Sequence, residues 1–196
     1  MDKKKLNVIL IVLTIIVGIF FVQSVSNMLN KSKTPEIVEP DTPIENIEPQ
    51  ENNDTGIYVN VFFIGQNKAG EEVYKAVKRK YDPQIDGSPI EFSIKALFDG
   101  PRPEETKYGV YSEIPVGTRV LNIMDGDDAI YVNVSKHFEL GGGTDSIYKR
   151  LFQLIKTAEY NTKKPVYLLI DNIKVEVIGG DGIMINQPLS ENSIGQ

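Results

Sequence analysis

The longest apolar stretch of the chain lies near its N-terminus, where the run from Leu6 to Val22 follows three lysines. A run of this length is at the short end of a membrane-spanning helix. It is longer than the apolar part of an ordinary signal peptide, and the lysines favour a cytoplasmic N-terminus. We therefore expect residues 1–30 to form an uncleaved anchor in the cytoplasmic membrane, with the rest of the chain outside. A cleaved signal peptide is the alternative.

A polar, proline-rich segment follows this run. Between Thr34 and Thr55 the chain has four prolines and seven acidic residues but no basic residue. Such a composition does not support a packed core and gives an extended chain. We predict a disordered linker over residues 31–55, whose carboxylates could alternatively bind a basic partner. A folded domain over residues 56–190 and a tail over residues 191–196 complete the predicted organisation.

The first part of the folded domain has the alternating pattern of a β-hairpin. Tyr58 to Ile64 is rich in β-branched and aromatic residues, which predicts a strand. Glu72 to Tyr81 alternates in the same way after a Lys68-Ala69-Gly70 turn. We predict that this second stretch is an exposed strand paired with the first, and a short helix is the alternative.

A helix is predicted to begin at Ser88. Its hydroxyl can cap the helix, Pro89 suits the first helical position, and Glu91 would complete a capping box. Gly100 and Pro101 mark the end, because glycine accommodates the left-handed residue after a helix and proline prevents continuation. The apolar face of this helix comprises Ile90, Ile94, Leu97 and Phe98.

The second half of the domain begins with another hairpin pattern. Thr118–Met124 and Ala129–Val134 are predicted strands, and Asp125-Gly126 between them predicts a tight turn with positive φ angles. Two further strands are predicted at Pro165–Ile170 and Lys174–Ile178.

A second helix, capped by Thr144 or Asp145, is predicted between these pairs of strands. Its apolar stripe comprises Ile147, Leu151, Leu154, Ile155 and Ala158. The order of elements predicts an α+β fold in which two helices pack on one mixed, mostly antiparallel sheet.

Composition narrows the possible chemistry. The net charge of −6 argues against a nucleic-acid partner, which requires a basic face. The chain has no cysteine, so disulfides, thiolate nucleophiles, cysteine-ligated zinc and a lipidated N-terminal cysteine are excluded. His137 is the single histidine, which excludes a site with two histidine ligands and weakens any catalytic triad.

Two segments resemble ligand-binding loops only in part. Asp125, Asp127 and Asp128 lack the spacing of an EF-hand calcium loop, so we interpret them as a hairpin turn. The glycines of residues 141–143 precede a helix, where backbone N–H groups could hold an anion. A phosphate loop also has a lysine at the helix start, where this chain has Asp145, so we interpret the glycines as a flexible connection.

Two pairs of residues are candidate catalytic groups. Ser135 and His137 are predicted to point the same way from one strand, but the sequence has no nucleophile elbow. Glu104 and Glu105 are neighbours and therefore cannot flank a sugar from two sides. They suit the N-terminal turn of a short helix. We accordingly predict no catalytic, cofactor-binding or metal-ligating residue.

The segment after the first helix resembles the central signature of the GerMN domain family, which is named for a bacterial sporulation and germination lipoprotein. Further similarity follows in the same order along the chain, so that the resemblance spans about Ile57 to Leu189. The similar stretches are Leu97 to Pro101, Pro103 to Glu105, Gly109 to Pro115 with Gly117-Thr118, Val132 to Ser135, Gly179 to Ile183, and Gln187 to Leu189.

The resemblance implies a domain without enzymatic activity or cofactor, similar to the ring-building motifs that assemble envelope channels. The expected partners are other envelope proteins or further copies of the chain. The motif residues are then structural, namely Gly100, Pro101, Gly109, Ile114, Pro115, Gly117, Gly180, Gly182 and Pro188. The candidate contact surface comprises Arg102, Lys107, Tyr108 and Tyr111. The alternative function is an envelope enzyme, or a protein that binds cell-wall glycan or a small ligand.

Overall fold

The computed structural model describes residues 46–47 and 56–194. The predicted anchor and most of the predicted linker lie outside these residues. Over the described residues, no helix has the length and apolar character that crossing a bilayer requires.

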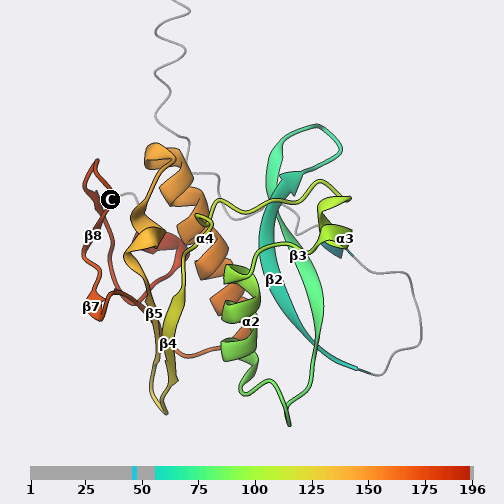
Figure 1. Ribbon diagram of the computed structural model, residues 1–196, viewed down its shortest axis with the longest axis horizontal. Helices are drawn as coiled ribbons and strands as arrows, with labels where there is room; N and C mark the ends of the chain where they lie inside the picture. The colour runs from blue at the N-terminus through green and yellow to red at the C-terminus, as the bar shows by residue number, and fades with distance from the viewer. Residues whose placement is uncertain (1–45, 48–55, 195–196) are drawn as a thin grey trace, which may run out of the picture. The chain divides into compact units, whose positions relative to one another are not determined.

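Two sheets enclose a layer of helices (Figure 1). One sheet contains β1 (Asn46–Ile47), β3 (Glu72–Tyr81) and β2 (Ile57–Gln66), in that order. The other contains β4 (Val120–Asp125), β5 (Ile130–Val134), β6 (Val166–Ile170) and β7 (Ile173–Lys174), in that order. Strands β8 (Val177–Ile178) and β9 (Ile183–Met184) pair with each other.

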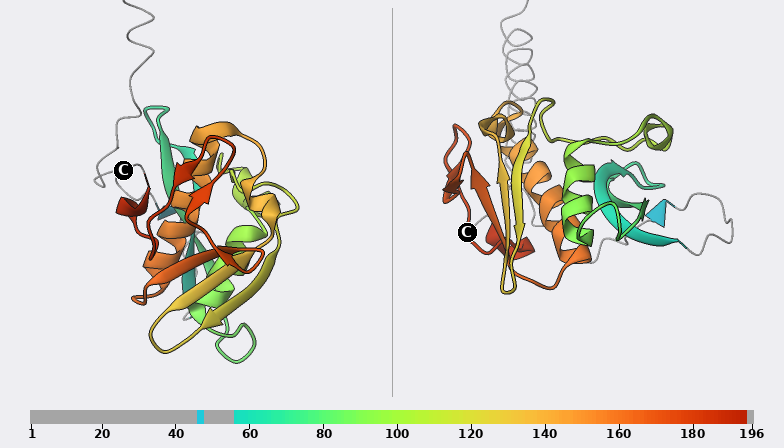
Figure 2. Two further views of the ribbon diagram at one scale, coloured as in Figure 1. Left: turned by 90° about the vertical axis from the view of Figure 1, so that its left-hand side faces the viewer. Right: turned by 60° about the horizontal axis from the view of Figure 1, so that its bottom comes forward.

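Helices α2 (Pro89–Phe98) and α4 (Gly143–Asn161) form the layer between the sheets, as the right-hand view of Figure 2 shows. A short helix, α3 (Pro103–Thr106), follows α2. The 3-10 helix η1 (Lys136–Glu139) precedes α4. A second 3-10 helix, η2 (Glu191–Ser193), lies near the C-terminal end of the described residues.

The predicted α+β class is confirmed, but the predicted single sheet is wrong. In the second sheet β4–β5 and β6–β7 are antiparallel, whereas β5–β6 is parallel and connected through α4. Helix α4 lies between the second sheet and the β2–β3 hairpin. Both sheets can pack against α4, because buried residues occupy most of the circumference of this helix. They comprise the apolar stripe together with Ser146, Arg150, Gln153 and Thr157. A helix buried on several sides needs partners on more than one side.

The hairpin of β2 and β3 confirms the first sequence prediction, and its antiparallel register runs from Ile57 opposite Tyr81 to Gln66 opposite Glu72. The prediction that the second strand is exposed is wrong. Lys75 and Arg79 are buried, as are the apolar residues Val73, Val77 and Tyr81 on the same side of the strand. This side faces the helices, so two cationic side chains enter the interior.

Part of the predicted linker is structured. Asn46 and Ile47 pair in parallel with Ala76 and Val77 of β3, which contradicts the prediction of disorder at these two residues. The physical reason is that β2 pairs with only one edge of β3, and the other edge offers backbone hydrogen-bonding groups to an additional strand.

The first predicted helix is confirmed as α2. The Ser88 hydroxyl accepts a hydrogen bond of 3.3 Å from the Glu91 N–H. The predicted capping box is incomplete, because the Glu91 carboxylate pairs with Lys95 one turn later (2.6 Å). Gly100 has φ +81° and follows the C-cap residue Asp99, as predicted.

The predicted hairpin of β4 and β5 is present, but its turn differs from the prediction. Gly126 does not have a positive φ angle. Instead, residues 126–129 form a four-residue loop in which the Gly126 N–H donates to the Ala129 carbonyl (3.1 Å). A loop of this length needs no left-handed residue at Gly126, whereas a two-residue turn would.

Helix α4 begins earlier than predicted. Its N-cap is Gly142, with φ +84°, and neither Thr144 nor Asp145 caps it. A Cβ atom on Gly142 would lie 2.2 Å from the Ser146 Oγ atom, so the backbone can take this path only at a glycine. The Thr144 hydroxyl instead donates to Asp181 (2.6 Å), which links the start of α4 to the C-terminal segment.

The strand predicted at Pro165–Ile170 is confirmed as β6. The next predicted strand, at Lys174–Ile178, is interrupted. The stretch from Lys174 to Ile178 contains the end of β7 and all of β8, separated by residues 175–176, because β8 pairs with β9 rather than with β6. Asp171 and Asn172 form the turn before β7 with φ +48° and +68°. In the stretch predicted as a tail, Ser193 and Ile194 are buried against the domain.

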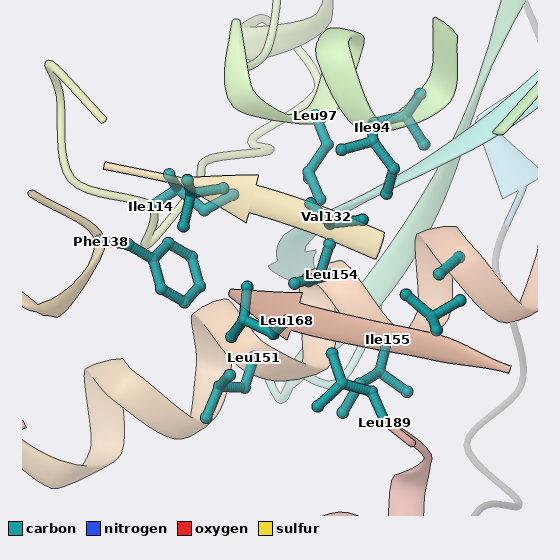
Figure 3. Close-up of a cluster of buried hydrophobic side chains, with 14 of the residues drawn as sticks. Ile94, Leu97, Ile114, Val132, Phe138, Leu151, Leu154, Ile155, Leu168 and Leu189 are labelled. Atoms are coloured by element: carbon teal, nitrogen blue, oxygen red, sulfur yellow. The ribbon is translucent and has the colours of Figure 1, made fainter. Parts of the chain in front are cut away.

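The hydrophobic core extends from β2 and β3 of the first sheet, through the helix layer, to β5 and β6 of the second sheet. Figure 3 shows Leu151 and Leu154 of α4 beside Val132 of β5 and Leu168 of β6, with Leu97 of α2 above them. The apolar faces predicted for both helices are therefore confirmed as core faces.

Candidate interaction surface

The segment of residues 99–119, here called the connecting segment, runs from the end of α2 through α3 to the start of β4. It contains all four residues of the predicted contact surface. Side chains from β3 and α4 and the backbone of β2 hold it at three places.

The first attachment is a buried ion pair between Arg79 of β3 and Glu105 of α3. The Arg79 Nε atom donates to Glu105 Oε1 (3.1 Å), and Nη2 donates to Oε2 (2.6 Å). Oε2 also accepts from the Arg102 N–H (2.7 Å). Only 3% and 11% of the two side-chain surfaces are exposed, so water does little to screen this pair.

The same guanidinium fixes the end of α2. Arg79 donates to the carbonyls of Ala96 (3.2 Å) and Gly100 (2.9 Å), and it lies 5.5 Å from the centre of the Phe63 ring. Carbonyls at a helix C-terminus lack intrahelical partners and attract cations. Arg79 therefore explains why Gly100 and Glu105 occur in one sequence signature.

The second attachment is at Tyr111. Its backbone exchanges two hydrogen bonds with Ile64 of β2 (2.9 and 2.8 Å), and its hydroxyl donates to Glu72. Burial and this hydrogen bond raise the pKa of Tyr111 to about 12. Tyr111 is thus half-buried and engaged with the hairpin, whereas we predicted an exposed contact residue.

Glu72 also belongs to an ionic cluster with α4. Lys149 lies 2.7 Å from Glu72 and 2.8 Å from Asp145. The hydrogen bond from Lys149, and then that from Tyr111, lower the pKa of the Glu72 carboxyl. The two carboxylates raise the pKa of Lys149. The cluster joins the hairpin, the connecting segment and α4.

The third attachment is a buried amide. Gln153 of α4 accepts from the Glu113 N–H (2.9 Å) and donates to the Phe62 carbonyl (3.2 Å). Its neighbour one turn later, Thr157, accepts from the Phe62 N–H (3.0 Å). Asn161 continues the row at Asn60. Polar side chains of α4 therefore take the place of a neighbouring strand along β2.

A second buried arginine shapes the glycine-rich connection. Arg150 is 1% exposed and donates to the carbonyls of Phe138 (2.6 Å), Leu140 (3.0 Å) and Gly141 (2.9 Å). It also donates to the Ser146 hydroxyl (2.8 Å), which itself donates to Glu113 (2.5 Å). Burial lowers the pKa of Arg150. The connection is therefore a fixed turn around a cation, whereas we predicted a flexible one.

The predicted contact residues separate into two groups. Arg102, Lys107 and Tyr108 are exposed on and around α3, and 63% of the Tyr108 surface is accessible. Within the described part of the chain, no hydrogen bond or ion pair involves the side chain of Arg102 or Lys107. Tyr111 lies apart from them at the hairpin.

Most of the motif residues occupy turns or the core. Gly100, Gly109, Gly117 and Gly182 have φ angles of +81°, +73°, +92° and +70°, which non-glycine residues rarely adopt. Ile114 is buried, and the Pro115 carbonyl accepts from the Thr118 N–H and hydroxyl. Pro188 follows a cis peptide bond. Gly180 does not have a positive φ angle, and Pro101 lines a pocket beside α2.

Ser135 and His137, the candidate pair considered above, do not lie on one strand. Strand β5 ends at Val134, and His137 lies on η1 with its side chain exposed. Ser135 is buried, and its hydroxyl accepts from the Arg119 N–H (3.0 Å). The prediction that both residues share one strand is therefore wrong. Within residues 46–47 and 56–194, no cluster of three or more carboxylates or imidazoles could hold a metal ion.

Sequence reasoning missed Arg79, Arg150 and Gln153. Arg79 lies among apolar positions of the same parity on β3, and that pattern could have indicated a buried cation. Gln153 and Thr157 are one helical turn apart beside the apolar stripe of α4, which could have indicated a buried polar row.

These features define an α+β domain with helices between two sheets and a long connecting segment fixed by buried polar contacts. The chain belongs to the Germane family, described as sporulation and spore germination, whose family model matches residues 60–176. The resemblance to the GerMN domain is thereby confirmed. No curated protein matches the sequence.

Two solved structures from Bacillus subtilis share the fold. The tandem GerMN domains of the sporulation protein GerM match with a TM-score of 0.52 and 16% identity, over 75% of this chain and 49% of that one. The first GerMN domain of GerM matches with a TM-score of 0.51 and 16% identity, over 69% of this chain and 98% of that one. This chain thus spans about half the length of the tandem protein.

Proposed function

We propose that this chain is a non-catalytic assembly module of the bacterial cell envelope, of the kind that acts in sporulation or germination. Residues 1–30 anchor it in the cytoplasmic membrane and the GerMN domain lies outside. It binds other envelope proteins, or further copies of itself, through the part of the connecting segment around α3.

The observation that carries this proposal is the contrast between the two sides of that part of the segment. Glu105 faces inward and is fixed by Arg79. Arg102, Lys107 and Tyr108 face outward. Arginine and tyrosine are enriched at protein interfaces, and a rigid surface loses little conformational entropy on binding. Binding residues also occur frequently on loops that are held in place by a rigid scaffold.

Charge reversal tests the proposed surface. We expect Arg102→Glu and Lys107→Glu to leave the Tm unchanged and to reduce the recovery of crosslinked partners from cells. Lys136→Glu on η1 is the matched control, since it makes the same change at an exposed lysine elsewhere. Equal recovery from all variants, or an equal loss in the control, would contradict the proposal.

Protease accessibility tests the proposed location. Protease added to cells stripped of their outer layers should digest the domain. Protection of the domain would contradict an external location, and a mature N-terminus close to Val25 would show that the anchor is cleaved.

A further inference from the structure

A pocket of about 450 Å³ lies between α2, β3 and the first residues of the connecting segment. Its volume falls in the range of sites that hold small molecules or peptide side chains. Phe92, Pro101 and Pro103 supply apolar wall, and these residues belong to two parts of the chain that Arg79 holds together. The pocket is therefore built by the same contacts that fix the connecting segment.

The polar groups of the pocket are mainly cationic. Arg79, Lys95 and Arg102 line it, and Asp99 is the acidic residue among the lining residues. The charge of Arg79 is offset by Glu105, and that of Lys95 by Glu91. Neither Arg102 nor Asp99 has such a partner among the described residues, so the lining carries one unpaired guanidinium and one unpaired carboxylate.

Arg79 also retains a hydrogen-bond donor. A guanidinium has five N–H groups, and four of those on Arg79 have acceptors, at Glu105, Ala96 and Gly100. The remaining N–H, on Nη1, has no acceptor within the described residues. Arg79 is 3% exposed, and an unpaired donor on a buried group is unfavourable unless a ligand or water meets it.

We propose that this pocket binds a carboxylate of an acidic, extended segment of the partner protein. The carboxylate accepts hydrogen bonds from the free N–H of Arg79 and from Arg102, and the neighbouring residues of the segment pack on Phe92, Pro101 and Pro103. This inference rests on the proposed binding function and names the chemistry of the partner.

The test uses the full chain and a fluorescent peptide of alternating glutamate and proline, with a glutamine–proline peptide as its neutral counterpart. We expect the acidic peptide alone to bind. Arg102→Glu should weaken binding roughly tenfold, since it removes a charge-assisted contact and introduces repulsion. Asp99→Asn should strengthen binding about two- to threefold, because it removes the opposing charge. Lys136→Glu, on η1 and outside both the pocket lining and the proposed surface, should change it less than about twofold.

Three results would overturn the pocket. They are equal binding of the neutral peptide, equal effects of Arg102→Glu and Lys136→Glu, and absence of binding by the acidic peptide. The carboxylate could come from a protein segment or from a free small acid, and competition by acetate at constant ionic strength distinguishes the two. Displacement of the fluorescent peptide by acetate would indicate a free small acid. If the pocket fails but Lys107→Glu still reduces partner recovery, the proposed function stands. If the peptide results hold and partner recovery is unaffected, the proposed function fails instead.

Discussion

Arg79 and Glu105 form a buried, two-pronged ion pair that fastens α3 to β3. Removal of one member of such a pair leaves an uncompensated charge in the interior and costs about 3–5 kcal/mol. We expect Glu105→Ala to lower the free energy of unfolding by about 3 kcal/mol, measured by urea denaturation. Glu104→Ala, at the exposed neighbour, should change it by less than about 0.5 kcal/mol. Similar losses in both variants would show that the pair contributes little.

The polar row on α4 should protect individual backbone groups of β2. Thr157→Val removes the acceptor of the Phe62 N–H, whereas Gln153→Met removes the donor to the Phe62 carbonyl. Each should destabilise the domain by about 1–3 kcal/mol, because a buried polar group loses its partner. Amide exchange at Phe62 should accelerate more in Thr157→Val than in Gln153→Met. Equal rates of amide exchange at Phe62 in the two variants would argue against the separate hydrogen bonds from Thr157 and Gln153.

Substitution of the adjacent residues Gly142 and Gly143 distinguishes the effect of backbone strain from that of steric overlap. Gly142 and Gly143 both have positive φ angles, so alanine at either position is strained by about 1–2 kcal/mol. A Cβ atom on Gly142 would also overlap Ser146, while one on Gly143 would meet open space. We expect the Tm to fall further in Gly142→Ala than in Gly143→Ala. The reverse order would contradict the described start of α4.

The ionic cluster around Glu72 predicts a dependence on pH. Because its pKa is lowered in the folded state, the contribution of Glu72 is present above the pKa of the unfolded chain and is lost as the pH falls through the folded value. The effect on stability should be small, since 45% of this side chain is exposed. NMR titration should show that Lys149→Met raises the pKa of Glu72 more than Tyr111→Phe does. An unchanged pKa in Lys149→Met would rule out the cluster.

Ser135 and His137 should behave as structural and surface residues respectively. Ser135→Ala removes the acceptor of the Arg119 N–H and should cost about 1 kcal/mol. His137→Ala alters an exposed side chain and should leave both stability and partner recovery unchanged. Loss of cellular function in His137→Ala, at unchanged Tm and unchanged partner binding, would support an enzymatic role.

Local features of this domain could be predicted from the sequence because the interacting residues are close along the chain. Ser88 caps α2 through the N–H three residues later, and the apolar faces of α2 and α4 follow helical spacing. The β2–β3 hairpin also follows from alternation and a short connection. Of the motif glycines predicted to be structural, Gly100, Gly109, Gly117 and Gly182 take left-handed angles, and Gly180 does not.

The number of sheets and the composition of the interaction surface were decided by contacts between distant residues. Arg79 and Glu105 are 26 positions apart, and Gln153 and Phe62 are 91 positions apart. Neither local propensity nor periodicity specifies such a partner, so Arg79 was predicted to be exposed and Tyr111 was predicted to lie with Arg102. By itself, the sequence determined the two long helices, the two hairpins and the family, because these depend on local patterns. Only the tertiary structure determined which charged side chains are buried and paired, because that depends on where the rest of the chain places their partners.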